Sequence, residues 1–323
     1  MRFTLCIPTM NARQHWPEFW AALQAQTIHP EEVIVVDSAS TDGTEELVRA
    51  SGARVVRIER SDFRHGGARQ LAAEMAGKVD FLLYMTQDAV LAKQDSVFRL
   101  LTRFDDPHIS AAYGRQLPRQ GADPITAHAR FFNYPDKSAS RSLGDAPVVG
   151  FKTIFFSDAF GAYRRTALMR VGGFPVEAQF GEDTQTVARM LLAGSKVAYA
   201  ADAPVFHSHA LSLAQEFHRY FEIGWMHASE PWLEQTFGGT GGEGFRFVRS
   251  ELKYLARRAP YLWPIALTRT AAKLVAYKYG KMSAASAERH LQQFARALEK
   301  LRSSGVHSHL GNHPHKLVSR FHD

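Results

Sequence analysis

Two aspartates near the start of the chain each follow a short apolar run. Asp37 comes directly after VIVV, and Asp88 comes near the end of VDFLLYMTQDA. If both runs are strands of one parallel sheet, the carboxylates lie at the edge where such sheets bind ligands. Asp37 could accept a hydrogen bond from a ring NH, such as that of uracil or thymine, and Asp88 could hold a divalent cation against a diphosphate. Either aspartate alone could equally cap a helix or a turn, but the pair favours a site.

Two further pairs of residues could take part in chemistry. Glu182 and Asp183 stand in GED, ahead of a helical pattern. A carboxylate there could act as a general base, although acidic residues also suit the first turn of any helix. His207 and His209 stand in VFHSHA, after a strand-like run. Side chains two apart on a strand point the same way, so both imidazoles could bind a metal ion, while a structural role stays open.

Arg69 lies in HGGARQ, at the start of another helical pattern. An arginine near a helix start suits an anion, and Gly66 and Gly67 allow a close backbone approach. The alternative for Arg69 is a solvated cation on the helix surface.

The elements that must position these residues alternate in type along the first part of the chain. Strands are expected at 3–7, 33–36, 53–59 and 79–89, and helices at 16–26, 40–52 and 66–76. This alternation predicts an α/β fold with a mostly parallel sheet.

The pattern is weaker from residue 115 to residue 149, where Pro, Asp, Ser and Arg are frequent. We interpret this stretch as a long, partly helical excursion over the site, of the kind that often forms a lid. A strand, turn and helix at 155–174, a helix at 181–194 and a last strand at 196–209 complete the expected arrangement.

The character of the chain changes after residue 210. Helical, aromatic sequence is followed by GGTGGEG and then by a stretch in which aromatic residues and cations are mixed. We predict one domain over 1–225 and a basic, aromatic α-helical extension over 226–323, ending in a disordered, His-rich tail. Aromatics with flanking cations suit a lipid headgroup interface. The alternative is a helical domain packed on the core, with its basic face solvated or joined to another subunit of a homo-oligomer.

Composition and charge limit the remaining function classes. The chain has 323 residues, 45% of them hydrophobic, a net charge of +7 and one cysteine. A single cysteine, Cys6, excludes an internal disulfide and a cysteine-based zinc site. No signal peptide is recognisable, and no run reaches the roughly 18 apolar residues of a spanning helix. We therefore expect a cytoplasmic protein, free or peripheral on the cytoplasmic face of the inner membrane. Nucleic acid suits the charge but not the predicted α/β site.

Five segments in order carry a resemblance to a known family: IPTMN, VIVVDSASTDGTEELV, HGGARQLAAE, LYMTQDAV and GGFPVEAQFGEDTQTVARMLLAG. Over residues 3–225 the chain resembles inverting family 2 glycosyltransferases of the GT-A fold, and among them bacterial rhamnosyltransferases that use dTDP-L-rhamnose. The resemblance implies a Rossmann-like nucleotide-sugar-binding domain. It departs from the family's Asp-any-Asp metal motif, because Thr86 stands where the first aspartate would be.

The resemblance also implies roles for individual residues. Asp37 would contact the pyrimidine base, Asp183 would be the general base, and Glu182 would orient Asp183 or touch the acceptor. The implied nucleotide-binding residues are Pro8, Thr9, Asn11, Asp37, Arg69, Gln87 and Asp88. The implied ligands of a divalent cation, Mg²⁺ or Mn²⁺, are Asp88, His207 and His209.

The implied activity is inverting transfer of L-rhamnose to a hydroxyl of a bacterial surface glycan, such as O-antigen, lipopolysaccharide core or capsule. The acceptor would be lipid-linked or lipopolysaccharide. One alternative keeps the fold and mechanism with a UDP-sugar donor. Another is a non-catalytic module that binds a nucleotide sugar or a lipid. A sugar-phosphate nucleotidyltransferase is disfavoured, because IPTMNARQ lacks a Gly-rich, Arg-containing loop after the first strand.

Overall fold

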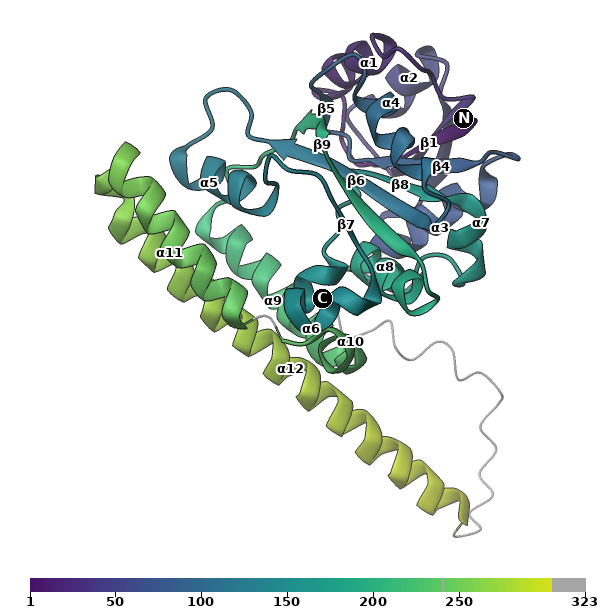
Figure 1. The fold of residues 1–323 in the computed structure, drawn as a ribbon. Helices are drawn as coiled ribbons and strands as arrows, with labels where there is room; N and C mark the ends of the chain where they lie inside the picture. Colours follow the sequence, from purple (N-terminus) through teal and green to yellow (C-terminus); the bar gives the residue numbers. More distant parts are fainter. Residues whose placement is uncertain (240, 304–323) are drawn as a thin grey trace.

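The computed structural model describes residues 1–239 and 241–303, and Figure 1 shows their arrangement. The predicted His-rich tail lies outside the described residues. Within them, a twisted sheet is covered by helices on both faces, and four helices from the second half of the chain run beside it.

The sheet has nine strands in the order β3-β2-β1-β4-β8-β6-β9-β5, with β7 paired to β9. The strands are β1 (Phe3–Thr9), β2 (Glu32–Ser38), β3 (Arg54–Ile58), β4 (Phe81–Met85), β5 (Val90–Leu91), β6 (Ile109–Leu117), β7 (Ala139–Arg141), β8 (Phe160–Arg164) and β9 (Lys196–Phe206). The first four strands are mutually parallel, as the alternation predicted. β8 runs antiparallel to both β4 and β6, and β6 is parallel to β9, so the second half of the sheet is mixed.

The helices connect these strands. They are α1 (Trp16–Gln24), α2 (Thr44–Ala50), α3 (His65–Met75), α4 (Ser96–Leu101), α5 (Pro124–Asn133), α6 (Ala146–Val149), α7 (Arg165–Arg170) and α8 (Glu182–Leu192). The three helices expected before residue 80 are all present. Short 3₁₀ turns lie at Arg60–Asp62, Thr102–Asp105, Leu143–Asp145, Gly150–Ile154 and Pro260–Leu262.

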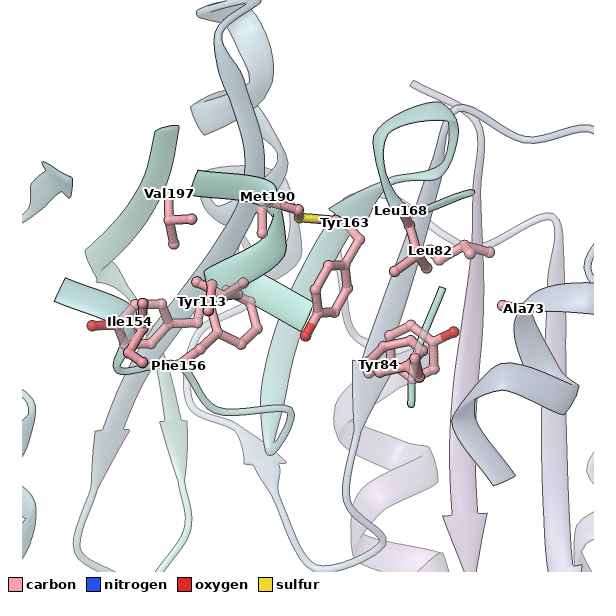
Figure 2. Packing of buried hydrophobic residues seen from close by; sticks show 14 of the residues in the cluster. Ala73, Leu82, Tyr84, Tyr113, Ile154, Phe156, Tyr163, Leu168, Met190 and Val197 are labelled. Atoms are coloured by element: carbon pink, nitrogen blue, oxygen red, sulfur yellow. The ribbon is translucent and has the colours of Figure 1, made fainter. Parts of the chain in front are cut away.

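Alternation along the strands divides the core into two clusters. Ile34, Leu82 and Tyr163 pack on the side of α3 and α8, while their neighbours Val35, Leu83 and Ala162 pack on the side of α1 and α4. Figure 2 shows the first cluster, in which tyrosines and other large side chains fill the space between the strands and the 150–156 segment. Burial on both faces explains why the strands read as unbroken apolar runs. Cys6 is fully buried in this core.

The 115–149 stretch is partly helical, as predicted, but its first residues belong to a strand that sequence reasoning did not identify. β6 lies between β8 and β9 and ends in the polar residues Arg115 and Gln116. Gln116 is buried although it is polar, so the end of the strand carries no alternating pattern of apolar and polar residues. After β6, α5, β7 and α6 occupy the rest of the stretch, and its role as a lid stays a prediction.

The C-terminal helices are α9 (Leu213–Ser229), α10 (Pro231–Phe237), α11 (Gly241–Arg258) and α12 (Trp263–Ser303). α12 packs along α9, and α11 packs on α5. The predicted domain boundary at 225/226 falls inside α9, and the division into two domains stays a prediction. Among the described residues, no helix is both long and apolar enough to cross a bilayer.

Candidate active site

The predicted metal ligands lie together after the ends of β4 and β9. The Oδ2 atom of Asp88 lies 3.3 Å from Nε2 of His207 and 2.8 Å from Nε2 of His209, and the two Nε2 atoms lie 3.0 Å apart. One ligand atom of each residue lies within 4.8 Å of the others. We call Asp88, His207 and His209 the metal cluster, because a carboxylate and two imidazoles at this spacing can bind a divalent ion.

Gln116 fixes the tautomer of His207. Its Oε1 atom lies 2.9 Å from Nδ1 of His207 and also accepts a hydrogen bond from Arg130, while its Nε2 atom donates to Ser157. Because an arginine can only donate, the atom facing it is the amide oxygen, and Nδ1 of His207 carries the proton. Nε2 then presents its lone pair to the cluster, as in histidines whose second nitrogen is hydrogen-bonded while the first binds a metal.

The surroundings of Asp88 favour its charged form. Burial opposes ionisation, but the hydrogen bonds that His207 and His209 donate when their imidazoles are protonated at Nε2 outweigh it and lower the carboxyl pKa. Arg119 donates from Nη2 to the backbone carbonyl of Asp88 at 2.8 Å, and its backbone N–H donates to Ser208 at 3.0 Å. One residue therefore holds both loops of the metal cluster, and the carboxylate is in the form that a cation requires.

Near the ends of β1 and β2, the carboxylate of Asp37 forms hydrogen bonds within the protein. It is fully buried, and its Oδ1 atom accepts hydrogen bonds from the hydroxyls of Thr9 at 2.9 Å and Ser40 at 2.6 Å. Its Oδ2 atom accepts from the backbone N–H of Ser40 at 2.9 Å. A turn-organising role accounts for these contacts, and the contact of Asp37 with a pyrimidine base stays a prediction. Pro8 precedes Thr9 within β1.

Asn11 and Gln87 brace the loops at the same edge. Asn11 has a left-handed backbone with φ of 50°. Its N–H donates to Ser40 at 2.8 Å, and its Oδ1 atom accepts from the N–H of Thr41 at 3.0 Å. Gln87 exchanges two hydrogen bonds with the backbone of Met10, at 2.8 and 3.0 Å. Both side chains therefore shape the loops, and their contacts with nucleotide stay predictions.

Two hydroxyls near this edge have no hydrogen-bond partner in the part of the chain that the structure describes. They are Oγ of Ser38, the last residue of β2, and Oγ1 of Thr86, directly after β4, and both atoms are buried. A buried hydroxyl without a partner costs about 1–3 kcal/mol. A ligand whose polar atoms reach them would recover that energy, which favours this edge as a binding site.

Arg69, Asp158, Glu182 and Asp183 form a second group that we call the acidic cluster. Nε of Arg69 lies 2.9 Å from Oδ2 of Asp158, and Nη1 lies 3.0 Å from Oε1 of Glu182. Arg69 is only 4% exposed, so the solvated alternative does not hold. Its guanidinium is engaged by the protein's own carboxylates, and the nucleotide contact predicted for Arg69, which stays a prediction, is not favoured by this geometry.

Two glycines bring the elements of the acidic cluster together. A Cβ atom at Gly66, on α3, would lie 1.8 Å from the carbonyl oxygen of Pro175, so the close approach expected here is made by the protein's own backbone. Gly181 has φ of 76° and precedes α8, which places Glu182 and Asp183 in the first helical turn. This is a conformation that glycine adopts without strain.

Three carboxylates share one guanidinium in the acidic cluster, so not all of them ionise readily. Burial raises the pKa of Asp158 to about 8, with Arg69 opposing the shift. Burial also raises the pKa of Asp183 to about 6, with the charge of Glu182 adding and Arg69 opposing. Oδ1 of Asp183 accepts a hydrogen bond from the N–H of Thr184 at 2.6 Å. A carboxyl with a pKa near 6 is ionised at neutral pH yet takes up a proton readily, as a general base must.

The two clusters are joined through consecutive residues. Ser157 accepts the hydrogen bond from Gln116, which holds His207. Asp158 pairs with Arg69 and accepts a hydrogen bond from Tyr163 at 2.8 Å. The short segment before β8 therefore sets the position of the metal cluster relative to the acidic cluster.

Comparison with known proteins decides the family. Residues 4–172 match the family described as glycosyl transferase family 2. The chain is 45% identical to the O-antigen chain rhamnosyltransferase RfbN of Salmonella typhimurium, over 87% of this chain and 90% of that protein. It is 44% identical to the O-antigen chain rhamnosyltransferase WbaN of Salmonella anatum, over 86% and 89%. The chain belongs to glycosyltransferase family 2. It is therefore an enzyme, and the reading as a non-catalytic module is set aside.

Solved structures confirm the GT-A-type fold of this glycosyltransferase. A mannosyltransferase from Pyrobaculum calidifontis, solved with GDP-Man and Mn²⁺, superposes with a TM-score of 0.54 at 20% identity, over 94% of this chain and 84% of that one. Residues 1–349 of TarS from S. aureus, solved with UDP-GlcNAc, superpose with a TM-score of 0.53 at 17% identity, over 89% and 92%. At these identities the likeness concerns the fold.

Sequence reasoning missed several residues of the candidate site. They are Ser38, Gln116, Arg119, Arg130, Ser157 and Asp158. The signal for Asp158 was present, since an aspartate in FFSDAFGAY directly precedes a strand. Gln116 could be found only by recognising β6, because its contact with His207 joins residues 91 apart in sequence.

Proposed function

We propose that this glycosyltransferase transfers L-rhamnose from dTDP-L-rhamnose to a hydroxyl of a bacterial surface glycan, with inversion at the anomeric carbon. The observation that carries the proposal is the identity of 45% and 44%, over nearly the whole length of each chain, to two O-antigen chain rhamnosyltransferases. We further propose a lipid-linked or lipopolysaccharide acceptor, and peripheral contact with the inner membrane. A homo-oligomer stays a prediction.

The metal cluster supports the donor half of the proposal. Asp88, His207 and His209 would hold a divalent cation, whose charge offsets the charge that develops on the leaving diphosphate. Two imidazoles are not the oxygen-rich set that Mg²⁺ usually takes, so we expect Mn²⁺ to bind more tightly than Mg²⁺. The unpaired hydroxyls of Ser38 and Thr86 would receive polar atoms of the nucleotide.

The acidic cluster supports the acceptor half. Asp183 would accept the proton of the acceptor hydroxyl while that oxygen attacks the anomeric carbon. The bond between the anomeric carbon and the diphosphate oxygen breaks on the opposite face, so the configuration inverts and the nucleoside diphosphate leaves. Glu182, held by Arg69 at 3.0 Å, would fix the first turn of α8 and so the direction of Asp183.

The proposal is tested with the full chain and a panel of donors: dTDP-L-rhamnose, UDP-glucose, UDP-GlcNAc, UDP-galactose and GDP-mannose. Release of nucleoside diphosphate is measured with Mn²⁺, with Mg²⁺ and with a chelator, first alone and then with lipid-extracted glycan acceptors. Proton NMR of the product assigns the anomeric configuration.

Selective turnover of dTDP-L-rhamnose with an inverted product is the expected result. Preference for a UDP-sugar would overturn the rhamnose assignment while keeping fold and mechanism. A product of retained configuration would overturn the role given to Asp183. Equal turnover with and without the chelator would overturn the role given to the metal cluster.

A further inference from the structure

The long helix α12 is fixed to the enzyme along one face. Ala266, Ala276 and Ala284 on that face are almost fully buried, and α12 packs along α9. The crossing is close, because a Cβ atom at Gly280 would lie 2.1 Å from the carbonyl oxygen of Phe221, and one at Gly224 would lie 2.1 Å from that of Tyr277. Small residues at this contact determine which face of α12 is turned inward and which outward.

The opposite face of α12 is apolar as well. We call it the outer face; its exposed large apolar side chains are Val275, Tyr279 and Met282, while Trp263, Ile265, Leu267 and Leu274 are exposed on the flanks of the helix, and Tyr261 precedes them in the turn before it. Met282 is 68% exposed and Val275 is 58% exposed. A surface helix that faces water normally carries polar residues there, and a contiguous exposed apolar surface marks an interaction site.

The charge around the outer face has one sign. From residue 252 to residue 287 the sequence contains seven Lys or Arg residues and no Asp or Glu. Three of the cations are engaged with the protein: Arg269 and Lys273 pair with Glu216, and Lys281 pairs with Glu234. The others, Lys253, Arg257, Arg258 and Lys278, are exposed.

We propose that the outer face of α12 and the turn at Tyr261 lie in the interface of an anionic lipid bilayer. Lipid headgroups of negative charge complement the exposed cations that form no salt bridge among the described residues, and Trp and Tyr favour the headgroup level. An amphipathic helix with apolar and basic residues lies in the plane of the interface rather than across it. A second copy of the chain is a poorer occupant, because a two-fold contact through this face would bring Lys278 and its neighbours near the same cations.

This seating would connect the membrane to the metal cluster. Arg269 of α12 donates to the backbone carbonyl of Leu211 and to Oε2 of Glu216. Leu211 follows His209 by two residues, so the loop of the metal cluster is tied to the helix that would rest on lipid. The binding specifies the surface behind the membrane contact proposed above and does not depend on the sugar transfer, but the consequence rests on the proposed function: a lipid-linked acceptor would be presented at a fixed height relative to the donor site.

The test uses the full chain and flotation with two kinds of vesicle, phosphatidylcholine alone and phosphatidylcholine with phosphatidylglycerol. The outer-face variant carries L274S, V275S and M282S, all at exposed positions. Its matched control carries F98S, V148S and V176S, which are exposed apolar residues outside α12. A third variant, K278E, changes charge alone. Release of dTDP from dTDP-L-rhamnose in solution reports separately on the active site.

We expect the wild type and the matched control to bind the anionic vesicles and to be released by salt. The outer-face variant should bind at least about tenfold more weakly, because polar side chains replace three apolar ones that would be buried in the bilayer, and K278E should bind more weakly than wild type. Equal binding of the outer-face variant and the wild type would overturn the proposal. So would a wild type that dimerises in solution, by light scattering, when the outer-face variant is monomeric and neither binds vesicles. Donor turnover unchanged in every variant separates these outcomes from failure of the proposed function.

Discussion

The metal cluster and the acidic cluster use similar residue types but differ in exposure and in charge balance. In the metal cluster one carboxylate meets two imidazoles, and His209 has 42% of its side chain exposed. In the acidic cluster three carboxylates meet one guanidinium, and Arg69 and Glu182 have no more than 7% of their side chains exposed. The first arrangement can open toward a ligand, whereas the second is closed around its own ion pairs.

The difference indicates how the enzyme divides its work. Ion pairs as buried as those of Arg69 add little net stability against an apolar replacement, but they fix geometry. The buried ion pairs of the acidic cluster therefore hold Asp183 in a fixed position at the start of α8. The metal cluster is held by loops and by one amide, Gln116, and in our proposal it is the part that binds the donor and releases the nucleoside diphosphate.

The largest expected effect is loss of turnover on changing Asp183→Asn. Removing a general base should lower kcat by a factor of about 10²–10⁴, with little change in the KM for the donor, because Asp183 faces the acceptor in our proposal. Steady-state rates with the donor that the panel identifies measure both constants. If the variant keeps more than about a tenth of the wild-type kcat, Asp183 is not the base.

The control for this prediction is Glu177→Gln, an exposed carboxylate shortly before α8, which should leave kcat unchanged. The wild-type rate should also fall as the pH drops below about 6, because the raised pKa of Asp183 leaves it protonated there and unable to accept a proton. A rate that is flat from pH 5 to pH 7 would contradict the assignment.

The next effect concerns the metal cluster. Asp88→Asn removes its one carboxylate, which is a direct ligand, and should weaken Mn²⁺ binding by at least about a hundredfold, since even the loss of an outer-shell partner costs about 10–100-fold. Isothermal titration of Mn²⁺ into the full chain measures the affinity without substrate. Asp62→Asn, at an exposed position, is the matched control. An unchanged affinity in Asp88→Asn would show that the ion binds elsewhere.

Much of this contrast could be predicted from sequence. A carboxylate after one strand and two histidines after another meet because both strands belong to one sheet, and Asp88, His207 and His209 do meet. The alternation of strands and helices was sufficient to predict the first four parallel strands. The local pattern also predicted the helix start at Glu182 and Asp183, since Gly181 and the acidic pair suit a first helical turn.

The rest depends on partners distant in sequence. Whether Arg69 points to solvent or inward is decided by Asp158 and Glu182, which lie about a hundred residues away and cannot be assigned to it from local pattern. The local sequence around Asp37 looks the same whether its carboxylate faces a ligand or closes the turn with Thr9 and Ser40. β6 was missed because its residues are buried on both faces and the strand ends in polar residues. The sequence there shows no alternation of apolar and polar residues by which a strand could be recognised.

A smaller effect tests the link between the two clusters. Gln116→Met removes the acceptor for Nδ1–H of His207 while keeping a similar shape, and should weaken Mn²⁺ binding by about tenfold. Gln116→Glu keeps an acceptor toward both His207 and Arg130 and should retain most of the affinity. If both variants bind Mn²⁺ equally and the melting temperature alone changes, Gln116 has only a structural role.

The smallest effect is a pH dependence of stability that arises in the acidic cluster. The folded-state pKa of Asp158 is raised to about 8 by burial, whereas the unfolded value is about 3.9. A raised pKa means that the folded state holds a proton which the unfolded state has released. The stabilisation is therefore complete below the unfolded pKa and is lost as the pH rises through about 8. Between pH 6.5 and 8, Asp158 by itself should lower the free energy of unfolding by on the order of 1 kcal/mol.

Asp158→Asn should remove most of this slope, because an amide has no proton to release. His65, His128, His207 and His227 give a slope of opposite sign, because burial lowers their pKa values and the unfolded histidines bind protons that the folded ones do not. The quantity that reports on Asp158 is therefore the difference in slope between the wild type and Asp158→Asn. Urea unfolding at several pH values measures both proteins, with Asp80→Asn, an exposed position, as control. A slope that is the same in Asp158→Asn as in wild type would mean that Asp158 is ionised throughout. Arg69 would then hold two charged carboxylates, and the proton of the acidic cluster would reside on Asp183 alone.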